Sequence, residues 1–364
     1  VIVNKGSSSE TTLTCNIQGT LNTLTDNWLT ISSGTLKYMR TEPGTNLTIS
    51  TTTPFTIAKN GGLHIEYSTS AGRTVLIGNA ANDNGDLLLE GKLTVVSGTV
   101  NIGASGNANN NDIEYLGTGT AEINVNGGTL FVNGQIRRNP GSLGAVLKYN
   151  QTAGTVTING QNANTTNAKF EVLNIGSTFN MSGGSITIVR GGGGAQFGDY
   201  YVRPTTSTVT GGLITFSQGT DNKEHTYIVE STAPFYNFTI TGKTTNPQRN
   251  AIVQLMLSSL LVKGNLTLSN IYSFLDVNSN TNVNVEIQGN LANDGTYNYQ
   301  QNTTTFSGDA QAVTGSVVTN FYDLVSNPVT SLTISRPFVV NRNLTIGSGQ
   351  LLVGVNNVEV RGDF

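Results

Sequence analysis

Hydrophobic and polar residues alternate in short segments along much of the chain. Val156 and Ile158 alternate with Thr155 and Thr157, and the same pattern occurs in 185–188 and 266–268. A period of two places aliphatic side chains on one face of a β-strand and threonines on the other. We therefore predict short strands whose Val, Ile and Leu side chains face a core and whose Thr side chains face outward.

A turn of small residues precedes many of these strands and recurs with a period near 28 residues. Tight corners favour glycine because it adopts positive φ, and stacked backbones leave little room for a Cβ atom. A drifting period of this length is typical of stacked solenoid coils. The glycines are Gly34, Gly98, Gly128, Gly154, Gly184 and Gly212, with Gly61-Gly62 as an intermediate in the first gap.

The fold class that follows is all-β. We predict a parallel β-solenoid, with a right-handed β-helix as the preferred form. Dividing 364 residues by the period gives about 13 coils. One continuous solenoid is expected to run through residues 1–364.

The repeat changes style near residue 220, which divides the solenoid into coils of about 28 residues in 1–220 and a duplicated block of about three coils in 221–364. The second copy is incomplete at Phe364, so the chain is expected to be part of a longer protein. Three pairs of segments carry the duplication: 235–238 with 321–324, 265–268 with 343–346, and 285–290 with 358–363.

The apolar stretch 251–263 resembles an amphipathic helix in its composition. Its counterpart in the second copy, 332–338, contains Pro337. Proline is excluded from a helix interior because it lacks an N–H and its ring clashes with the preceding turn. Two strands around a Ser258-Ser259 corner fit both copies.

Composition excludes several classes of function. Only 11% of the residues are charged and the net charge is −3, which leaves no electrostatic footprint for nucleic acid. No apolar run approaches the length of about 20 residues that a membrane-spanning helix requires. A hydrophobic content of 36%, regularly placed, excludes a disordered tail.

Carboxylates occur in neighbouring pairs, as glycoside cleavage would require. The pairs are Asp83 with Asp86, Asp112 with Glu114, and Asp221 with Glu224. None recurs at the coil spacing beside aromatic and basic residues, so we predict that they are solvated turn residues and that the chain is not an enzyme.

A calcium loop is suggested by the segment 82–86, but Ala80 occupies the first ligand position of the fuller pattern. We therefore predict neither a metal site nor a cofactor.

The most unusual segment is the glycine-rich stretch 190–203. It lacks the Gly-Lys-Ser/Thr of a phosphate-binding loop. One interpretation is a protruding loop that presents Arg190, Asp199, Tyr200, Tyr201 and Arg203 to a sugar or protein ligand; the other is a corner insertion between coils.

Two further motifs have structural interpretations: Arg137-Arg138 is a local basic spot, and Arg361-Gly362-Asp363 fits the strand-to-turn junction at which the first copy carries Gln288-Gly289-Asn290.

The segments 91–103, 123–138, 170–191 and 321–324 resemble a known group of proteins. They are similar to the large, repetitive β-helical surface proteins of Bacteroidetes, many of which are adhesins exported by type IX secretion, including the giant gliding-motility adhesin. The resemblance implies display on the outer cell surface, partners in the secretion and outer-membrane anchoring machinery, and no catalytic residues.

The leading hypothesis is a non-catalytic segment of an extracellular adhesin that supplies reach and a repetitive polar surface for polysaccharide or solid surfaces. One alternative is a polysaccharide lyase or hydrolase that uses Asp199, Tyr200 and Arg203. The other is a passive spacer or secretion-cargo segment.

Overall fold

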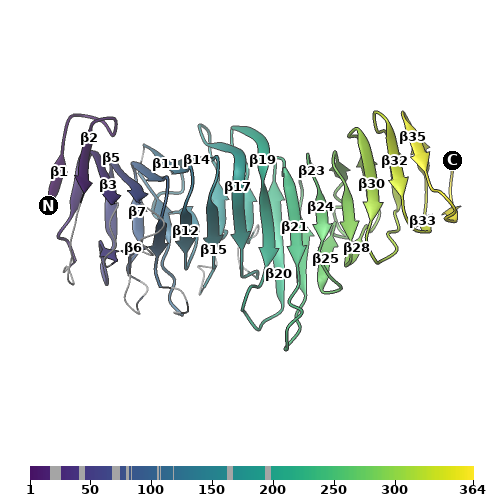
Figure 1. Ribbon diagram of the computed structural model, residues 1–364, viewed down its shortest axis with the longest axis horizontal. Coiled ribbons are helices and arrows are strands. Elements are labelled where there is room, and N and C mark those ends of the chain that lie inside the picture. Colours follow the sequence, from purple (N-terminus) through teal and green to yellow (C-terminus); the bar gives the residue numbers. More distant parts are fainter. Residues whose placement is uncertain are drawn as a thin grey trace. The chain divides into compact units, whose positions relative to one another are not determined.

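The computed structural model describes residues 1–16, 26–40, 46–67, 74–78, 82, 84–104, 106, 108–117, 119–161, 167–192 and 198–364. These residues form 36 strands and no helix. The strands are parallel and stack as a β-solenoid of about 11 turns, which confirms the predicted fold class (Figure 1). The predicted number of about 13 turns is therefore too high. The turns also vary in length, from the 34 residues between Ile136 and Phe170 to the 19 between Val285 and Thr304.

The chain divides into two compact units, each described by itself below. Unit 1 comprises Val1–Ile188 and Gly193–Thr208, and unit 2 comprises Val189–Gly192 and Val209–Phe364. The division lies close to the predicted change of repeat style near residue 220. A single solenoid continuing through 1–364 stays a prediction.

The strands of unit 1 form three parallel series, in which β3, β5 and β17 are long enough to belong to two. The first series contains β1 (Ile2–Asn4), β3 (Thr30–Arg40), β5 (Phe55–Tyr67), β7 (Leu87–Leu89), β10 (Ile113–Tyr115), β13 (Ile136–Arg138), β16 (Phe170–Val172) and β18 (Tyr200–Val202). The second contains β2 (Thr12–Asn16), β3, β5, β8 (Lys92–Val95), β11 (Thr120–Val125), β14 (Val146–Gln151) and β17 (Thr178–Ile188). The third contains β4 (Leu47–Thr48), β6 (Thr74–Ile77), β9 (Thr99–Ile102), β12 (Thr129–Val132), β15 (Thr155–Ile158) and β17.

Unit 2 is built in the same way. One series contains β20 (His225–Ser231), β22 (Ala251–Leu255), β25 (Ser273–Asp276) and β28 (Thr296–Asn298). A second contains β19 (Thr206–Ser217, in unit 2 from Val209), β21 (Asn237–Thr241), β24 (Leu266–Leu268), β27 (Leu291–Asn293), β30 (Ala310–Thr314), β32 (Ser331–Ile334) and β35 (Gln350–Leu352). The others are β23 (Leu260–Val262), β26 (Val285–Ile287), β29 (Thr303–Phe306), β31 (Asp323–Ser326) and β34 (Leu344–Ile346), and the pair β33 (Phe338–Val340) and β36 (Val358–Val360).

The core follows the predicted alternation. Val156 and Ile158 of β15 are fully buried, whereas Thr155 and Thr157 face outward. The outward row continues in register through Thr99, Thr129, Thr155 and Ser185. The predicted outer threonine row is therefore confirmed in unit 1.

Turn glycines have the predicted backbone conformation. The φ angles of Gly98, Gly128 and Gly154 are 82°, 62° and 74°. A Cβ atom added to Gly128 would lie 2.4 Å from the carbonyl oxygen of Gly98 in the adjacent coil. Both the conformation and the close stacking of the coils therefore require glycine at this corner.

The glycines of the first repeats belong to a different corner from the later ones. Gly34 pairs with Gly61 in the second strand series, and that series continues to Lys92, which pairs with Gly62. Gly98 instead precedes β9 of the third series. Gly34 and Gly98 therefore occupy different corners of the coil, because one coil contains more than one glycine turn. The interval between them does not measure two full turns of the solenoid.

The duplication in unit 2 is visible in backbone contacts. Phe235 forms a bridge with Val262, and its counterpart Phe321 forms one with Val340. The Tyr236 carbonyl accepts a hydrogen bond from Gly264 N–H at 2.7 Å. In the second copy, the Tyr322 carbonyl accepts one from Arg342 N–H at 2.8 Å.

The segment 251–263 contains two strands, β22 and β23, as predicted. The chain bends at Leu257 and Ser258 between them. Buried and half-buried residues alternate in both strands, which is the period of a sheet and not that of a helix.

Candidate functional site

One outward sheet face of unit 1 is open to solvent and is lined with polar side chains. It belongs to the second strand series, β2, β3, β5, β8, β11, β14 and β17, and we call it the polar face. Its two rows in register are Thr12, Thr35, Gly62, Lys92, Glu122, Lys148 and Thr178, and Thr14, Lys37, His64, Thr94, Asn124, Asn150 and Asn180.

Amide side chains on the polar face hold one another in fixed orientations. Asn150 Nδ2 donates to Asn124 Oδ1 at 2.9 Å, and Asn180 Nδ2 donates to Asn150 Oδ1 at 2.9 Å. Asn124 Nδ2 in turn donates to Glu122 Oε1 at 2.8 Å. Parallel strands bring equivalent residues about 4.8 Å apart. The face therefore presents a regular row of preorganised hydrogen-bonding groups.

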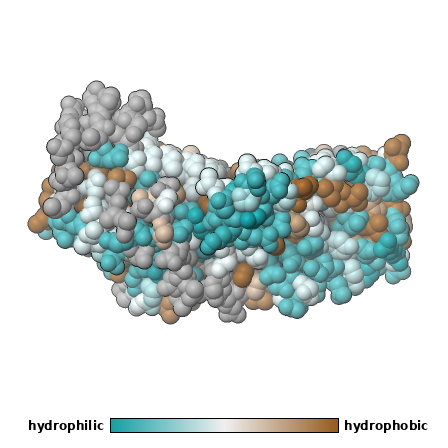
Figure 2. Space-filling model, turned by 90° about the horizontal axis from the view of Figure 1, so that it is seen from below, coloured by the Kyte–Doolittle hydropathy of each residue, from teal (hydrophilic) through white to brown (hydrophobic). Residues whose placement is uncertain are grey.

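Charges on the polar face are balanced locally. Lys37 Nζ lies 2.7 Å from Glu66 Oε2, and His64 Nε2 lies 2.9 Å from the same oxygen. Hydrogen bonds from Lys37 and His64 hold the pKa of Glu66 below its usual range. Because these charges are paired, this part of the polar face is suited to recognition by hydrogen bonds and shape. Figure 2 shows the same character more widely, since teal and white residues cover most of the visible described surface.

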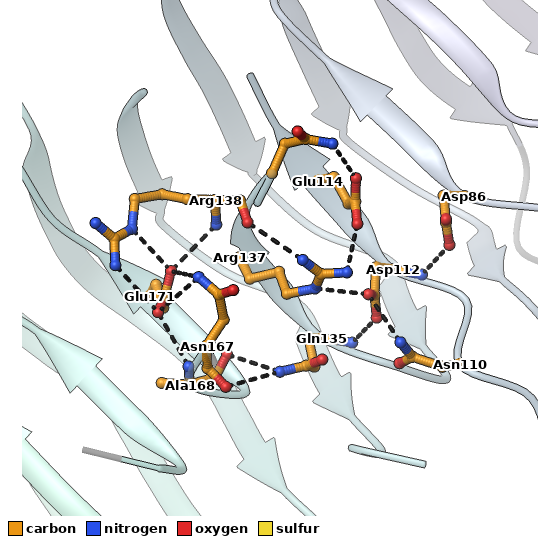
Figure 3. A network of polar contacts seen from close by, with 11 residues as sticks. Asp86, Asn110, Asp112, Glu114, Gln135, Arg137, Arg138, Asn167, Ala168 and Glu171 are labelled. Carbon is orange, nitrogen blue, oxygen red and sulfur yellow. Dashed lines mark hydrogen bonds and ion pairs between the residues drawn. The ribbon is translucent and has the colours of Figure 1, made fainter. Parts of the chain in front are cut away.

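A second polar cluster lies on the outward side of the first strand series, where that face is covered. Arg137 on β13 is in register with Glu114 on β10. Arg137 Nε lies 2.7 Å from Asp112 Oδ2, and its Nη2 donates to Glu114. The side chains of Asp112, Glu114 and Arg137 are only 1%, 9% and 6% exposed (Figure 3).

The charged cluster continues along the next coil. Arg138 Nε lies 3.0 Å from Glu171 Oε2. Glu171 also accepts hydrogen bonds from Asn167 Nδ2 at 3.1 Å and from Ala168 N–H at 3.0 Å. We call Asp86, Asp112, Glu114, Arg137, Arg138 and Glu171 the charge cluster. Ion pairs and hydrogen bonds compensate these side chains for the loss of water, as buried charges require.

Two carboxyls of the charge cluster have raised pKa values. Burial, together with the negative charge of Asp112, raises the pKa of Asp86 to about 8. Burial also raises the pKa of Asp112 to about 6, although Arg137 opposes this. At neutral pH these shifts favour the protonated form of Asp86 more strongly than that of Asp112. Asp86 Oδ1 accepts a hydrogen bond from Asp112 N–H at 2.8 Å.

The prediction that Asp112 and Glu114 are solvated turn residues is wrong. Arg137-Arg138 is not a local basic spot or a corner insertion, because both arginines lie on β13 and pair with carboxylates. Both faces of β10 are buried, because side chains from neighbouring corners, such as Asn110 and Asn139, cover its outward side. Opposite charges about one coil apart, such as Asp112 and Arg137, were the signal in the sequence.

The predicted loop residues differ in how far they are buried. Asp199 is fully buried, and its Oδ1 lies 3.0 Å from Lys169 Nζ. Tyr200 is 1% exposed and packs against Phe170 with ring centroids 5.6 Å apart. Burial raises the pKa of Tyr200. Neither residue is presented on a protruding surface, because both lie within the coil at β18.

The other predicted loop residues lie nearer the surface. Tyr201 is half-buried and in register with Glu171, and Arg203 is exposed. Arg190 belongs to unit 2, where its Nε lies 2.5 Å from Asp221 Oδ2. Burial opposes ionisation of Asp221, but Lys223 N–H and Arg190 hold its pKa below the ordinary value. Asp221 is only 10% exposed, which corrects its assignment as a solvated turn residue. Residues 193–197 lie outside the described part.

Arg361-Gly362-Asp363 is a repeat junction, as predicted. Asp363 N–H donates to Asn343 Oδ1 at 3.2 Å, and Asn290 N–H in the first copy donates to Asn265 Oδ1 at 2.9 Å. A Cβ atom at Gly362 or at Gly289 would lie 2.3 Å from a backbone carbonyl oxygen of the adjacent coil. The tripeptide therefore follows from coil stacking.

Among the described residues, no group of three or more His, Cys, Asp or Glu side chains is placed to hold a metal ion. Asp83 of the calcium-like segment lies outside those residues. No described segment forms a helix long and apolar enough to cross a membrane.

No protein-family model, curated protein or solved structure matches the chain.

Proposed function

We propose that this chain is a non-catalytic segment of an extracellular, cell-surface adhesin, and that it attaches to polysaccharide or solid surfaces through the polar face. The observation that supports this is the ordered row of outward amides at Asn124, Asn150 and Asn180. Groups held in one orientation lose little conformational freedom when they bind a ligand. A repeated surface of this kind can engage a repeating polymer at several places, which strengthens weak individual contacts.

Retention of the full chain on immobilised neutral polysaccharides and on silica tests this function. Retention is expected to change little with added salt, because hydrogen bonds between uncharged groups are not screened as ion pairs are. Asn150→Leu breaks the amide row and is expected to weaken retention. Asn280→Leu, at an exposed asparagine of unit 2, is the matched control and should not. A wild-type chain that passes every surface unretained would refute the proposal.

The localisation is tested on native cells. An antibody raised against this chain should detect a band that disappears when intact cells are treated with protease. The resemblance to Bacteroidetes surface adhesins supports this expectation. A band that is protected from protease in intact cells would contradict surface display.

One observation favours a second function, cleavage of polysaccharide. The unequal pKa values of Asp86 and Asp112, about 8 and about 6, are the arrangement that general acid–base catalysis uses. Ion-paired networks perturb pKa values as well. Asp112 is 1% exposed, so substrate could reach it only if the covering corners moved. Polysaccharide cleavage that is abolished by Asp86→Asn would establish this alternative and overturn the non-catalytic assignment.

A further inference from the structure

The polar face contains a depression near its N-terminal end. It encloses about 270 Å³ and is lined by residues from five strands, β2, β3, β5, β8 and β11, and from the segment that precedes β2. Polar groups dominate its wall, among them Glu10, Thr12, Lys92, Thr94 and Asn124. All of the residues that line it belong to unit 1.

Gly62 occupies an outward position of β5 in the wall of the depression. Its neighbours in the same row are Thr35 on one side and Lys92 on the other. A Cβ atom at Gly62 would lie 2.2 Å from Thr35 Oγ1, so the Thr35 side chain occupies the space over this glycine. The hydroxyl of Thr35 is held there by a hydrogen bond to the Ser9 carbonyl at 2.5 Å.

An exposed ion pair spans the depression. Lys92 Nζ lies 3.2 Å from Glu10 Oε1, and the Glu10 side chain is 80% exposed. An ion pair in this setting contributes little to stability, so its groups can turn to a ligand. A carboxylate accepts hydrogen bonds and an ammonium donates them. Together they match two adjacent hydroxyl groups, one of which donates to Glu10 while the other accepts from Lys92.

The charges around the depression favour neutral sugars over acidic ones. Lys92 is also 3.7 Å from Glu122 Oε2, so its positive charge is shared between two carboxylates. No excess positive charge remains to attract an acidic sugar. The volume is slightly below the range of about 300–1,000 Å³ that is typical of pockets for drug-sized ligands, which favours a single small unit.

We propose that this depression is a subsite for one neutral pyranose residue bearing a vicinal diol, held between Glu10 and Lys92. The inference rests on the proposed function and specifies its ligand class. Threonine hydroxyls and the Asn124 amide supply further hydrogen bonds around the ring.

Saturation-transfer NMR on the full chain tests the subsite with methyl α-D-glucopyranoside and methyl α-D-mannopyranoside. At least one is expected to bind at millimolar concentration. 2-(Hydroxymethyl)tetrahydropyran, which lacks the diol, is expected to bind at least about tenfold more weakly, because one tenfold step corresponds to the loss of a hydrogen bond to a charged group. Glucuronate is also expected to bind more weakly, because Glu10 and Glu122 repel its carboxylate. Absence of saturation transfer to both glycosides would overturn the subsite.

Substitutions of Glu10 and Lys92 test whether the glycoside binds in this depression. Glu10→Ala and Lys92→Met are each expected to weaken binding about tenfold. Glu359→Gln, which removes the exposed Glu359–Arg361 pair of unit 2, is the matched control and should bind normally. Unchanged binding in both variants would refute the assignment to this depression. Glu10 is exposed, so its replacement should leave the fold intact, which circular dichroism checks.

The two proposals fail differently. If polysaccharide surfaces retain the wild type and the Glu10→Ala variant equally, while no monosaccharide binds, the subsite is wrong and the adhesive function stands. If monosaccharide binds but no surface retains the chain, the adhesive function is wrong and the subsite stands. Competition by dextran or by a mannose-rich glycoprotein then separates a polysaccharide source of the pyranose from a glycoprotein source, and either result supports the subsite.

Discussion

Replacing Asp86 by asparagine is expected to stabilise unit 1 increasingly as the pH rises. Asparagine has nearly the same shape, and its Oδ1 can still accept the hydrogen bond from Asp112 N–H. It differs in that it carries no charge at any pH. In the wild type, ionised Asp86 would lie half-buried beside the charge of Asp112.

The direction in which the unfolding free energy changes with pH follows from the number of protons bound in the folded and unfolded states. The pKa of Asp86 is about 8 in the folded chain against an ordinary value of 3.8. Between these values the folded state holds a proton that the unfolded state has released. The contribution of Asp86 to stability is therefore greatest below pH 4 and falls as the pH rises toward 8. The asparagine variant has no such proton and escapes this loss.

The magnitude follows from the same shift. Each pH unit within this window costs up to about 1.4 kcal/mol of unfolding free energy, so three units, from pH 5 to pH 8, cost up to about 4 kcal/mol. Solvent reaches part of the half-buried carboxyl and reduces the effect. We expect the stability advantage of the variant to widen by about 2–4 kcal/mol between pH 5 and pH 8.

Urea unfolding followed by fluorescence measures this difference in unit 1. Trp28 is the only tryptophan of the chain and is half-buried in this unit, with Nε1 donating to the Thr48 carbonyl at 3.1 Å. Glu359→Gln makes the same charge change at an exposed site and should show no such pH dependence. A difference between Asp86→Asn and wild type that is constant from pH 5 to pH 8 would refute the reasoning.

Three further substitutions test the fold. Arg137→Met leaves two carboxylates buried without their partner and should lower the unfolding free energy by about 3–5 kcal/mol, whereas Arg361→Met, at an exposed ion pair, should leave the urea midpoint unchanged. Gly128→Ala places a Cβ atom 2.4 Å from a carbonyl oxygen at positive φ and should cost at least about 2 kcal/mol in urea unfolding, while Gly144→Ala meets no atom within 4 Å and should be neutral. Phe170→Ala opens a cavity among three aromatic rings and should cost about 3–5 kcal/mol, measured by the same unfolding; a cost below about 1 kcal/mol would contradict the packing described for this ring.

Comparison of the two copies of the duplicated block predicts local structure correctly at two places. Pro337 in the second copy excludes a helix in 251–263, and the structure has two strands there. The equivalence of Arg361-Gly362-Asp363 with Gln288-Gly289-Asn290 predicts a repeat junction, and the hydrogen bonds confirm it. Both inferences succeed because two copies of one structural unit obey the same steric constraints.

Candidate sites were harder to predict than the strands. Asp199 and Tyr200 follow a glycine-rich stretch, which suggests a protruding loop, yet they occupy the first positions of the coil at β18 and are buried. The depression at Gly62 depends on Glu10 and Lys92, which are 82 residues apart in sequence and 3.2 Å apart in space. No local pattern indicates such a pair.

The positions of the strands, their inward and outward faces and the glycine corners follow from the amino-acid sequence alone, because alternation and positive φ are properties of neighbouring residues. Which outward residues are covered depends on how the coils pack in three dimensions. Lys37 and Glu114 both point outward from strands, but other coils leave the first half-exposed and bury the second. The reason is that turn length varies from coil to coil, so the segment that covers a given face is set by the stacking of the whole solenoid.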